Sequence, residues 1–312
     1  MPDKKATRAA YGETLVELVK EGLDIYAVDA DLSASTTTAK LAEFDPSRHI
    51  NVGIAEQNMI GVAAGLALAG KTVFTGSFAV FGTGRAYDQI RNTVCYAGLN
   101  VKIAPTHAGI SVGPDGGSHQ MVEDLALMQV LPGMRVLVPA DYCSAKAALR
   151  IAALAQGPFY IRLGRTNVAQ IYEDRDGFAI GKAQVLRRGG DVTIIACGVE
   201  VALALEAADS LADKGIQAEV IDAFSIKPLD EKTIIESVAK TGFVVTAEEH
   251  SVYGGLGSAI AALLVKMPTM LRKPLVTIGV QDRFGTSGEF DELFKEYGLD
   301  ARSICDYVLQ YR

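Results

Sequence analysis

The sequence predicts an α/β protein with two domains, each built on a mostly parallel β-sheet. Three observations lead to this prediction. Short β-branched runs alternate with amphipathic stretches, one charged and non-periodic segment interrupts the alternation, and 312 residues suffice for about two domains of ~150 residues each. Alternating strands and helices form right-handed crossovers that place helices on both faces of a parallel sheet. Ligands of such sheets bind at the edge where the strands have their carboxyl ends.

The first domain is expected to span residues 1–170. Amphipathic spacing predicts helices at 15–19, 55–68 and 145–154. The most apolar stretch, 59–70, is too short to cross a bilayer and is interpreted as a buried helix. Apolar runs rich in β-branched residues predict buried strands at 25–28, 72–74, 101–104 and 136–138.

The second domain is expected to span residues 191–312 and to hold a smaller sheet of the same kind. A linker at 171–190 precedes it, because 170–177 is charged and non-periodic and 187–190 reads Arg-Arg-Gly-Gly, a turn signal. The second series of predicted strands lies at 192–197, 218–221, 243–246 and 275–278, and helices at 199–212, 231–239 and 257–266 separate them.

Composition narrows the class of protein. The balance of 30 Lys+Arg against 37 Asp+Glu gives a net charge of −7, which argues against a nucleic-acid partner. No apolar run follows the N-terminus, so neither a signal peptide nor a membrane partner is expected, and the protein is expected to be cytoplasmic. The cysteines form no Cys-x-x-Cys pair and are interpreted as reduced thiols: Cys95, Cys143, Cys197 and Cys305.

One carboxyl group stands where the pattern calls for apolar residues. Glu56 falls where a predicted strand gives way to the apolar helix at 55–68. It has two interpretations. It can stabilise the helix N-terminus through the helix dipole. Alternatively, Ile54, Met59 and Ile60 desolvate it, and it exchanges a proton with a bound heterocycle. The residues alone leave both interpretations open.

A second candidate site is a glycine-rich loop that begins where a predicted strand ends at Thr106. The loop holds His107, Asp115 and His119, three ionisable groups at the carboxyl edge of the sheet, which favours a functional role. The spacing does not favour a metal, since no fourth ligand and no close ligand pair accompany these residues. No metal ligand is therefore predicted in this chain.

Three further features have ordinary interpretations. Phe78 and Phe81 are three residues apart, and periodicity alone indicates a stripe of the core. The glycines at 254–257 lack the third glycine of a dinucleotide-binding loop and are interpreted as a helix start. The polar residues 248–250, Glu-Glu-His, form either a solvated loop or part of a catalytic site.

Taken together, these segments resemble the C-terminal half of transketolase and of related thiamine diphosphate enzymes. The resemblance follows the order of the family's motifs and covers essentially the whole chain. It implies a pyrimidine-binding domain followed by a transketolase C-terminal domain. The matching segments are 29–32, 53–57, 76–81, 106–107, 115–120, 131–141, 226–230 and 248–250.

The resemblance implies thiamine diphosphate as cofactor. Glu56 matches the glutamate that hydrogen-bonds N1′ of the aminopyrimidine and so assists removal of the thiazolium C2 proton. Phe78 and Phe81 match the aromatic pocket around the pyrimidine, which replaces the interpretation as a core stripe. Asp31 lies in the segment that the family places beside the cofactor and the dimer interface.

The resemblance also implies a sugar-phosphate site. His119 matches the histidine near the reacting hydroxyls, so His119 and Glu56 are the expected catalytic residues. Asp115 matches the carboxylate that recognises the substrate's C2 hydroxyl. Two guanidinium groups, a hydroxyl and an imidazole suit a phosphate dianion. The residues that match this phosphate-binding set are Arg8, Ser35, His107 and Arg165.

The sequence departs from the family at several positions. Gln57 stands where many transketolases have His, Gly84 stands where a third pocket aromatic is frequent, and Arg165 lies in a looser match. The Gly-Asp-Gly segment and Asn pair that hold Mg²⁺ and the diphosphate are not recognisable, since 113–116 differs and no Asn-Asn occurs. The resemblance therefore implies that an N-terminal partner subunit shares the cofactor and holds Mg²⁺.

The function implied is transfer of a two-carbon ketol group between sugar phosphates by a split transketolase, with two copies of each chain in a heterotetramer. Three alternatives remain at the level of sequence. They are the β subunit of a 2-oxo acid dehydrogenase, a deoxyxylulose-phosphate-synthase-like enzyme, whose segment resembles 85–89, and a non-catalytic regulatory subunit of the same fold.

Overall fold

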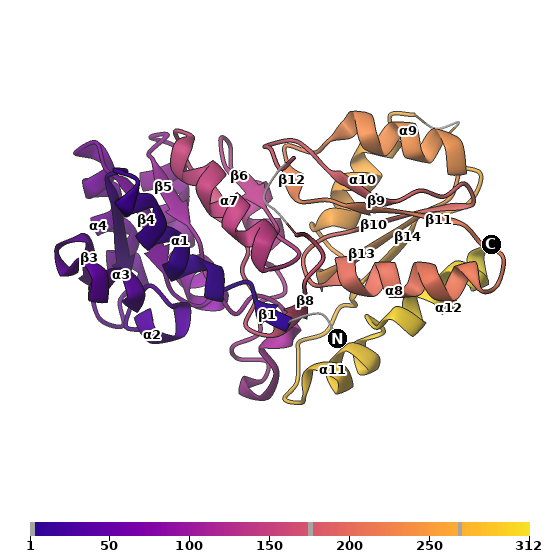
Figure 1. The fold of residues 1–312 in the computed structure, drawn as a ribbon, viewed down its shortest axis with the longest axis horizontal. Coiled ribbons are helices and arrows are strands. Elements are labelled where there is room, and N and C mark those ends of the chain that lie inside the picture. The colour runs from indigo at the N-terminus through magenta and orange to yellow at the C-terminus, as the bar shows by residue number, and fades with distance from the viewer. Residues whose placement is uncertain (1–3, 174–176, 268–269) are drawn as a thin grey trace.

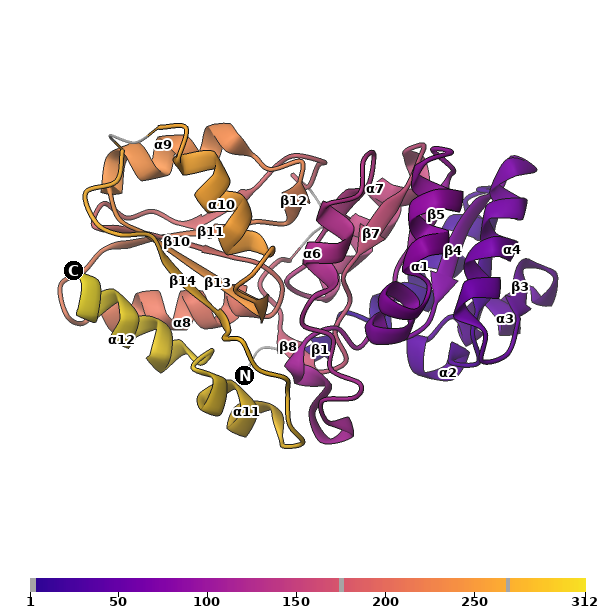
Figure 2. The same cartoon turned by 180° about the vertical axis from the view of Figure 1, so that it is seen from behind.

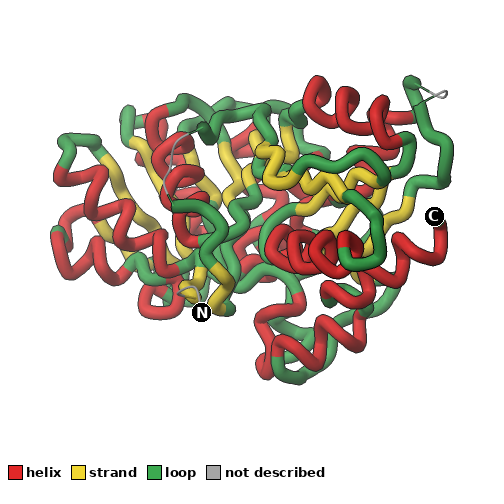
Figure 3. Tube along the Cα trace, turned by 45° about the vertical axis from the view of Figure 1, so that its right-hand side comes forward, coloured by secondary structure: helices red, strands yellow, loops and turns green. Residues whose placement is uncertain are grey.

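The computed structural model describes residues 4–173, 177–267 and 270–312 and shows two α/β domains side by side (Figure 1). The start of the chain at 1–3 and the charged residues 174–176 of the expected linker lie outside the described residues. Each domain has a central sheet with helices on both faces, as the alternating pattern predicts (Figure 3). Both sheets are parallel except for one antiparallel edge strand each.

The first sheet has seven strands in the order β12-β6-β7-β5-β4-β2-β3. Its inner strands β2, β4, β5 and β7 are largely buried because helices cover both faces of the sheet. The strands of this sheet are β2 (Ile25–Asp29), β3 (His49–Asn51), β4 (Thr72–Gly76), β5 (Val101–Ile103), β6 (Arg135–Leu137), β7 (Phe159–Ile161) and β12 (Ser225–Lys227). Its helices are α1 (Ala9–Lys20), α2 (Ser33–Thr36), α3 (Ala39–Phe44), α4 (Glu56–Leu68), α5 (Tyr87–Gln89), α6 (Asp124–Gln129) and α7 (Tyr142–Leu154).

The second sheet has five strands in the order β14-β13-β10-β11-β9. Helices α8 and α12 pack on one of its faces, and α9 and α10 lie on the other (Figure 2). The strands are β9 (Gln184–Arg187), β10 (Val192–Ala196), β11 (Ala218–Asp222), β13 (Val244–Ser251) and β14 (Val276–Val280). The helices are α8 (Glu200–Ala212), α9 (Glu231–Thr241), α10 (Leu256–Leu264), α11 (Phe290–Tyr297) and α12 (Ala301–Tyr311).

The two domains share strands and core. β12 follows β11 in the chain but pairs with β6 of the first sheet, and β9 lies inside the expected linker but pairs with β11. A small antiparallel ribbon of β1 (Lys4–Ala6) and β8 (Asn167–Ala169) lies between the domains. One apolar cluster runs from Val28 and Met59 in the first domain to Val244 and Ile260 in the second. The domains therefore share a joint core cluster, besides one cluster that lies mainly in each domain.

Two interpretations of local sequence are wrong. The stretch 59–70 is only half buried, because Met59 and Ile60 of α4 are buried whereas Leu68 at the end of this helix is 74% exposed. The polar residues 248–250 are not a solvated loop, because they extend β13 and are at most 4% exposed. Among the described residues, no helix is long and apolar enough to cross a membrane.

Candidate functional site

The candidate site lies where β4 and β5 end. The segments after these strands continue side by side, since Phe78 and Thr106 form a parallel bridge and the Ala79 amide donates to the Thr106 carbonyl at 2.8 Å. This pairing brings Phe78 and His107 into contact, with ring centroids 3.8 Å apart and stacked. The two sequence segments singled out above, at 76–81 and 105–120, therefore meet at one edge of the sheet.

Glu56 is the first residue of α4 and is 1% exposed. One carboxylate oxygen accepts from Arg85 Nη1 at 2.9 Å, and the other accepts from Ser77 Oγ at 3.5 Å. Both partners come from the segment after β4, so the carboxyl faces the sheet edge. The structure thus shows a desolvated carboxyl with specific partners at a helix N-terminus, where the helix dipole favours its charge.

An aromatic wall stands beside this carboxyl. Phe78 and Phe81 stack with centroids 6.1 Å apart, and the His119 ring meets the Phe81 ring edge-on at 5.4 Å. The Arg85 guanidinium lies over the Phe81 ring, 4.5 Å from its centroid. Phe81 belongs to a π-helical segment, Val80–Arg85, a distortion that is frequent at functional sites. Flat rings with a buried acid nearby are suited to hold an aromatic heterocycle.

Two arginines, Arg8 and Arg165, lie close enough to His107 for their charges to lower its pKa. Arg8 Nη1 donates to the Ser35 carbonyl at 2.8 Å, and Arg165 Nη1 donates to Asp115 Oδ1 at 3.0 Å. Both line a cavity of about 310 Å³. Burial and, secondly, the charge of Arg165 lower the pKa of Arg8, which shows that the guanidinium groups act on each other. Two like charges held together in a cavity create a potential that favours an anion.

The structure thus brings most of the predicted site residues together, and one lies apart. Ser35 contacts Arg8 through its backbone carbonyl rather than its hydroxyl. Asp31 has a left-handed φ of 64°, and its amide donates to Asn51 Oδ1 at 3.1 Å. No described contact joins Asp31 to the others. The members that form the cluster are Glu56, Phe78, Phe81, His107, His119, Asp115, Arg8, Ser35 and Arg165.

Sequence reasoning missed Arg85 and Ser77 as partners of Glu56. They lie 29 and 21 residues from it along the chain, and only the fold brings them to the same carboxylate. No local spacing could have revealed these pairs. Within the part of the chain that the structure describes, no group of three or more His, Cys, Asp or Glu residues is placed to hold a metal ion.

Among the site residues, His107 has the pKa that is displaced furthest from its usual value. Burial, then the charges of Arg8, Arg165 and His119, lower its pKa from 6.5 to about 3. The ring is 3% exposed, and its Nδ1 lies 2.7 Å from Thr106 Oγ1. The folded chain therefore holds His107 neutral, whereas the unfolded chain protonates it below pH 6.5.

The displaced pKa predicts a pH effect on stability. The stability contributed by neutral His107 is complete above pH 6.5 and is lost as the pH falls from 6.5 towards 3. Between pH 7 and pH 5, this group should lower the free energy of unfolding by about 2 kcal/mol. Urea unfolding should show this loss in the wild type between pH 7 and pH 5 but not in His107→Gln, so the free energy of unfolding should depend more steeply on pH in the wild type. Parallel slopes would contradict it.

Comparison with known proteins agrees with this geometry. Family models match the transketolase pyrimidine-binding domain over residues 3–170 and the transketolase C-terminal domain over residues 181–304. The chain is 49% identical over 308 residues to a putative transketolase C-terminal section of Methanocaldococcus jannaschii, covering 98% of this chain and 96% of that protein. It is 46% identical over 298 residues to the 6-deoxy-6-sulfo-D-fructose transketolase subunit SqwH of Clostridium sp. (strain MSTE9), covering 95% and 91%.

Longer proteins and a solved structure match as well. Human transketolase is 38% identical over 310 residues, which cover 98% of this chain but 49% of that protein. A solved structure described as a split gene transketolase, inactive beta4 tetramer, superposes with a TM-score of 0.89 at 49% identity, covering 99% of this chain and 98% of the other. The two α/β domains, their order and the sequence matches agree, and the chain therefore belongs to the transketolase family and comprises its pyrimidine-binding and C-terminal domains.

Proposed function

We propose that this chain is one subunit of a thiamine diphosphate-dependent transketolase that transfers a two-carbon ketol group between sugar phosphates. The observation that carries the proposal is the position of Glu56. The buried carboxyl lies beside the stacked Phe78 and Phe81 rings, with His119 at the edge of Phe81. Catalytic acid, heterocycle pocket and substrate-side histidine thus meet at one edge of the first sheet.

The residues present fit the pyrimidine end of the cofactor. Glu56 would hold the ring nitrogen N1′ through a shared proton, and Phe78 and Phe81 would flank the ring. Asp31 is proposed at the periphery of this pocket. When bound, the cofactor supplies the carbanion chemistry through its thiazolium ring.

The substrate side follows from charge and hydrogen bonding. Arg8 and Arg165 would hold the substrate phosphate in the cavity they line, with His107 and Ser35 beside them. Asp115 would accept a hydrogen bond from the sugar's C2 hydroxyl. His119 would then move a proton at the reacting hydroxyl, because its ring contacts the Phe81 ring at the edge of the proposed cofactor pocket.

A second subunit is proposed to hold Mg²⁺ and the diphosphate. Magnesium needs several oxygen ligands, and the described residues hold no group of three or more His, Cys, Asp or Glu placed to bind a metal ion. Ile54, which lies two residues before Glu56, is also an exposed apolar side chain. Relatives are named as a transketolase C-terminal section and as transketolase subunits, which supports a division of the enzyme between chains. We propose a heterotetramer with two copies of each chain.

Reconstitution tests the function. The chain is combined with a candidate N-terminal subunit, thiamine diphosphate and Mg²⁺, and ketol transfer from xylulose 5-phosphate to ribose 5-phosphate is followed. Transfer that requires both chains is the expected result. Activity with pyruvate alone would reject the transketolase assignment in favour of a related thiamine diphosphate enzyme. Absence of any activity with every candidate partner would favour a non-catalytic subunit.

Arg8→Ala should raise KM for phosphorylated sugars by about tenfold to a hundredfold, because a hydrogen bond to a charged group contributes roughly 1.5–3 kcal/mol. The KM for unphosphorylated sugars should change little. Steady-state kinetics with erythrose 4-phosphate and erythrose as paired acceptors separate the two effects. Lys20→Ala is the matched control, because Lys20 lies at the opposite end of α1 from Arg8. It should leave the KM for both acceptors unchanged. Equal effects of Arg8→Ala on both acceptors would contradict the phosphate role.

A further inference from the structure

The loop at 107–120 carries His107, Asp115 and His119 but has little regular structure of its own. It contains one short 3-10 helix, Ile110–Asp115, interrupted by a non-helical Gly113. Its internal backbone bonds are few and local, such as His119 N to Gly116 O at 3.0 Å. Inside the loop, Gln120 Nε2 donates to the Ile110 and Gly113 carbonyls at 3.2 and 3.3 Å, and contacts from outside the loop are needed to fix its position on the domain.

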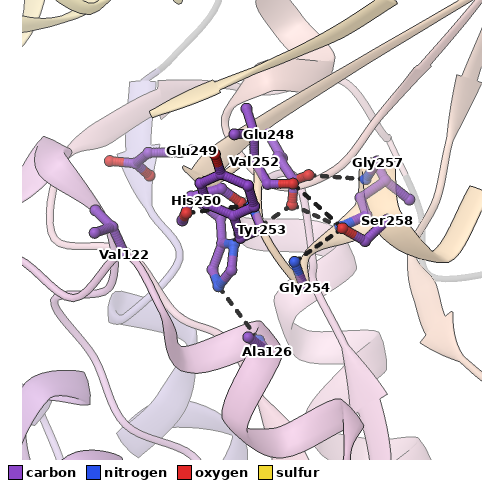
Figure 4. A network of polar contacts seen from close by, with 12 residues as sticks. Val122, Ala126, Glu248, Glu249, His250, Val252, Tyr253, Gly254, Gly257 and Ser258 are labelled. Carbon is purple, nitrogen blue, oxygen red and sulfur yellow. Dashed lines mark hydrogen bonds and ion pairs between the residues drawn. The ribbon is translucent and has the colours of Figure 1, made fainter. Parts of the chain in front are cut away.

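The second domain reaches this loop through Glu249. Glu249 lies on β13 and is 4% exposed, and its carboxylate accepts a hydrogen bond from the Ser111 backbone amide. Figure 4 shows Glu249 turned to the opposite side of β13 from Glu248, whose carboxylate accepts from the Gly257 amide at 2.8 Å within the second domain. Of the two adjacent buried glutamates, Glu248 therefore accepts hydrogen bonds within its own domain, and Glu249 accepts one from the loop of the first domain.

The loop is shaped to receive this carboxylate. Gly109 has a φ of 78°, and a Cβ there would lie 2.2 Å from the Glu249 carboxyl carbon. Arg162, at the end of β7, contacts both the backbone and the side chain of Glu249. Its Nη2 donates to the Glu249 carbonyl at 2.8 Å, and its Nη1 lies 3.7 Å from Glu249 Oε2. Burial raises the pKa of Glu249 to about 7, with Arg162 acting in the opposite direction.

A second contact lies at the other end of the loop, where the segment at 281–288 passes over it. Gln120 is 5% exposed, and its Nε2 donates to the Thr286 carbonyl at 2.8 Å. Ser287 Oγ donates to the Pro114 carbonyl at 2.7 Å. The approach is close, because a Cβ on Gly285 would lie 1.7 Å from Gln120 Oε1. The second domain thus contacts the loop on both sides of Asp115.

We propose that the second domain positions the substrate loop of the first domain, with Glu249 and Gln120 as positioning residues. Neither side chain needs to touch substrate. Glu249 fixes the loop before Asp115, and Gln120 fixes it directly after His119. Only the statement that the loop binds the sugar phosphate rests on the proposed function. The contacts between the domains stand independently of it.

Hydrogen exchange in the full chain tests the positioning without any activity. In Glu249→Ala, amides at 107–120 should exchange roughly tenfold to a hundredfold faster, the range expected for losing a hydrogen bond to a charged group. Glu249→Gln should restore most of the protection because its amide oxygen can still accept from Ser111. Glu248→Ala is the matched control, and it should speed exchange at the start of α10 but not in the loop.

Gln120→Met provides an independent variant should Glu249→Ala fail to fold. It keeps the side-chain volume but removes the donors to Thr286 and to the loop carbonyls. Faster exchange confined to 107–120 and 281–288 would support the proposal. Unchanged loop exchange in the folded variants would overturn it, and so would acceleration spread evenly over both domains.

Kinetics of the complex with the partner subunit then link positioning to function. Both variants should lower kcat/KM for sugar phosphates by about tenfold or more, while the affinity for thiamine diphosphate measured by calorimetry stays unchanged. A parallel loss of cofactor affinity would indicate general damage and overturn the proposal. Should the wild-type complex show no ketol transfer, the proposed function fails, and the exchange result alone supports or overturns the positioning role.

Discussion

Glu56→Gln should lower kcat of the assembled enzyme by roughly 10²–10⁴-fold, with little change in KM for the sugar phosphate. Glutamine keeps the size of the side chain and a carbonyl oxygen facing Ser77 and Arg85. It cannot share or transfer a proton, however, and that is the step proposed for Glu56. Because the carboxyl is 1% exposed, no bulk water can take over the role from the same direction.

The variant is expected to fold normally. Arg85, the ion-pair partner of Glu56, has a side chain that is 48% exposed, so it remains solvated when the charge on residue 56 is removed. Steady-state kinetics at saturating cofactor measure the effect, and an unchanged urea unfolding midpoint serves as the folding check. Glu17→Gln, on α1 and paired with Lys146, is the matched control and should retain full activity. Full turnover by Glu56→Gln would remove this residue from the mechanism.

The architecture was largely predictable because it depends on local patterns. The buried strands of both sheets are rich in apolar and β-branched residues, so β2, β4, β10 and β11 coincide with the predicted segments to within one or two residues. The main helices were found for the same reason, since α7 and α8 begin and end close to the predicted positions. The edge strands β9 and β12 were missed because each pairs with a distant strand and carries no strong pattern of its own.

The site residues were only partly predictable from the sequence. The residues suggested Glu56 and the loop with His107 as candidates, but only the family resemblance implied their roles. The polar run at 248–250 could not be interpreted correctly from composition, because buried charges are exceptional and depend on partners elsewhere in the chain. The guanidinium of Arg162 lies 87 residues before the Glu249 carbonyl that it contacts. Long-range compensation of this kind leaves no local signal.

Arg162→Met should lower the free energy of unfolding by about 3–5 kcal/mol, the cost typical of removing one partner from a buried ion pair. The Arg162 guanidinium binds both oxygens of Asp124, at 2.7 and 3.2 Å, and also lies 3.7 Å from Glu249. Asp124 is fully buried and accepts from Tyr160 at 2.6 Å as well. Methionine fills part of the space but leaves two buried carboxyl groups without a cation.

The loss in the free energy of unfolding of Arg162→Met should depend on pH. This dependence separates the effect of removing the Arg162 charge from the effect of changing its packing. Burial by itself would raise the pKa of Asp124, and Arg162 outweighs it and holds that pKa below the usual value. Without Arg162, the folded-state pKa of Asp124 rises above its unfolded value, and that of Glu249, which burial already raises, rises further. The variant therefore gains stability as the pH falls through these values. Urea unfolding should therefore show a larger loss at pH 8 than at pH 5.5.

A matched arginine tests the assignment to a buried pair. Arg150 on α7 forms a bidentate pair with Glu21 at 2.8 and 2.6 Å, but both side chains are partly exposed. Arg150→Met should therefore cost no more than about 1 kcal/mol and show no pH dependence of this kind. An equal loss for Arg162→Met at both pH values would show that the aliphatic part of the side chain dominates. The joint core of the two domains would then depend on packing at this position rather than on the ion pair with Asp124.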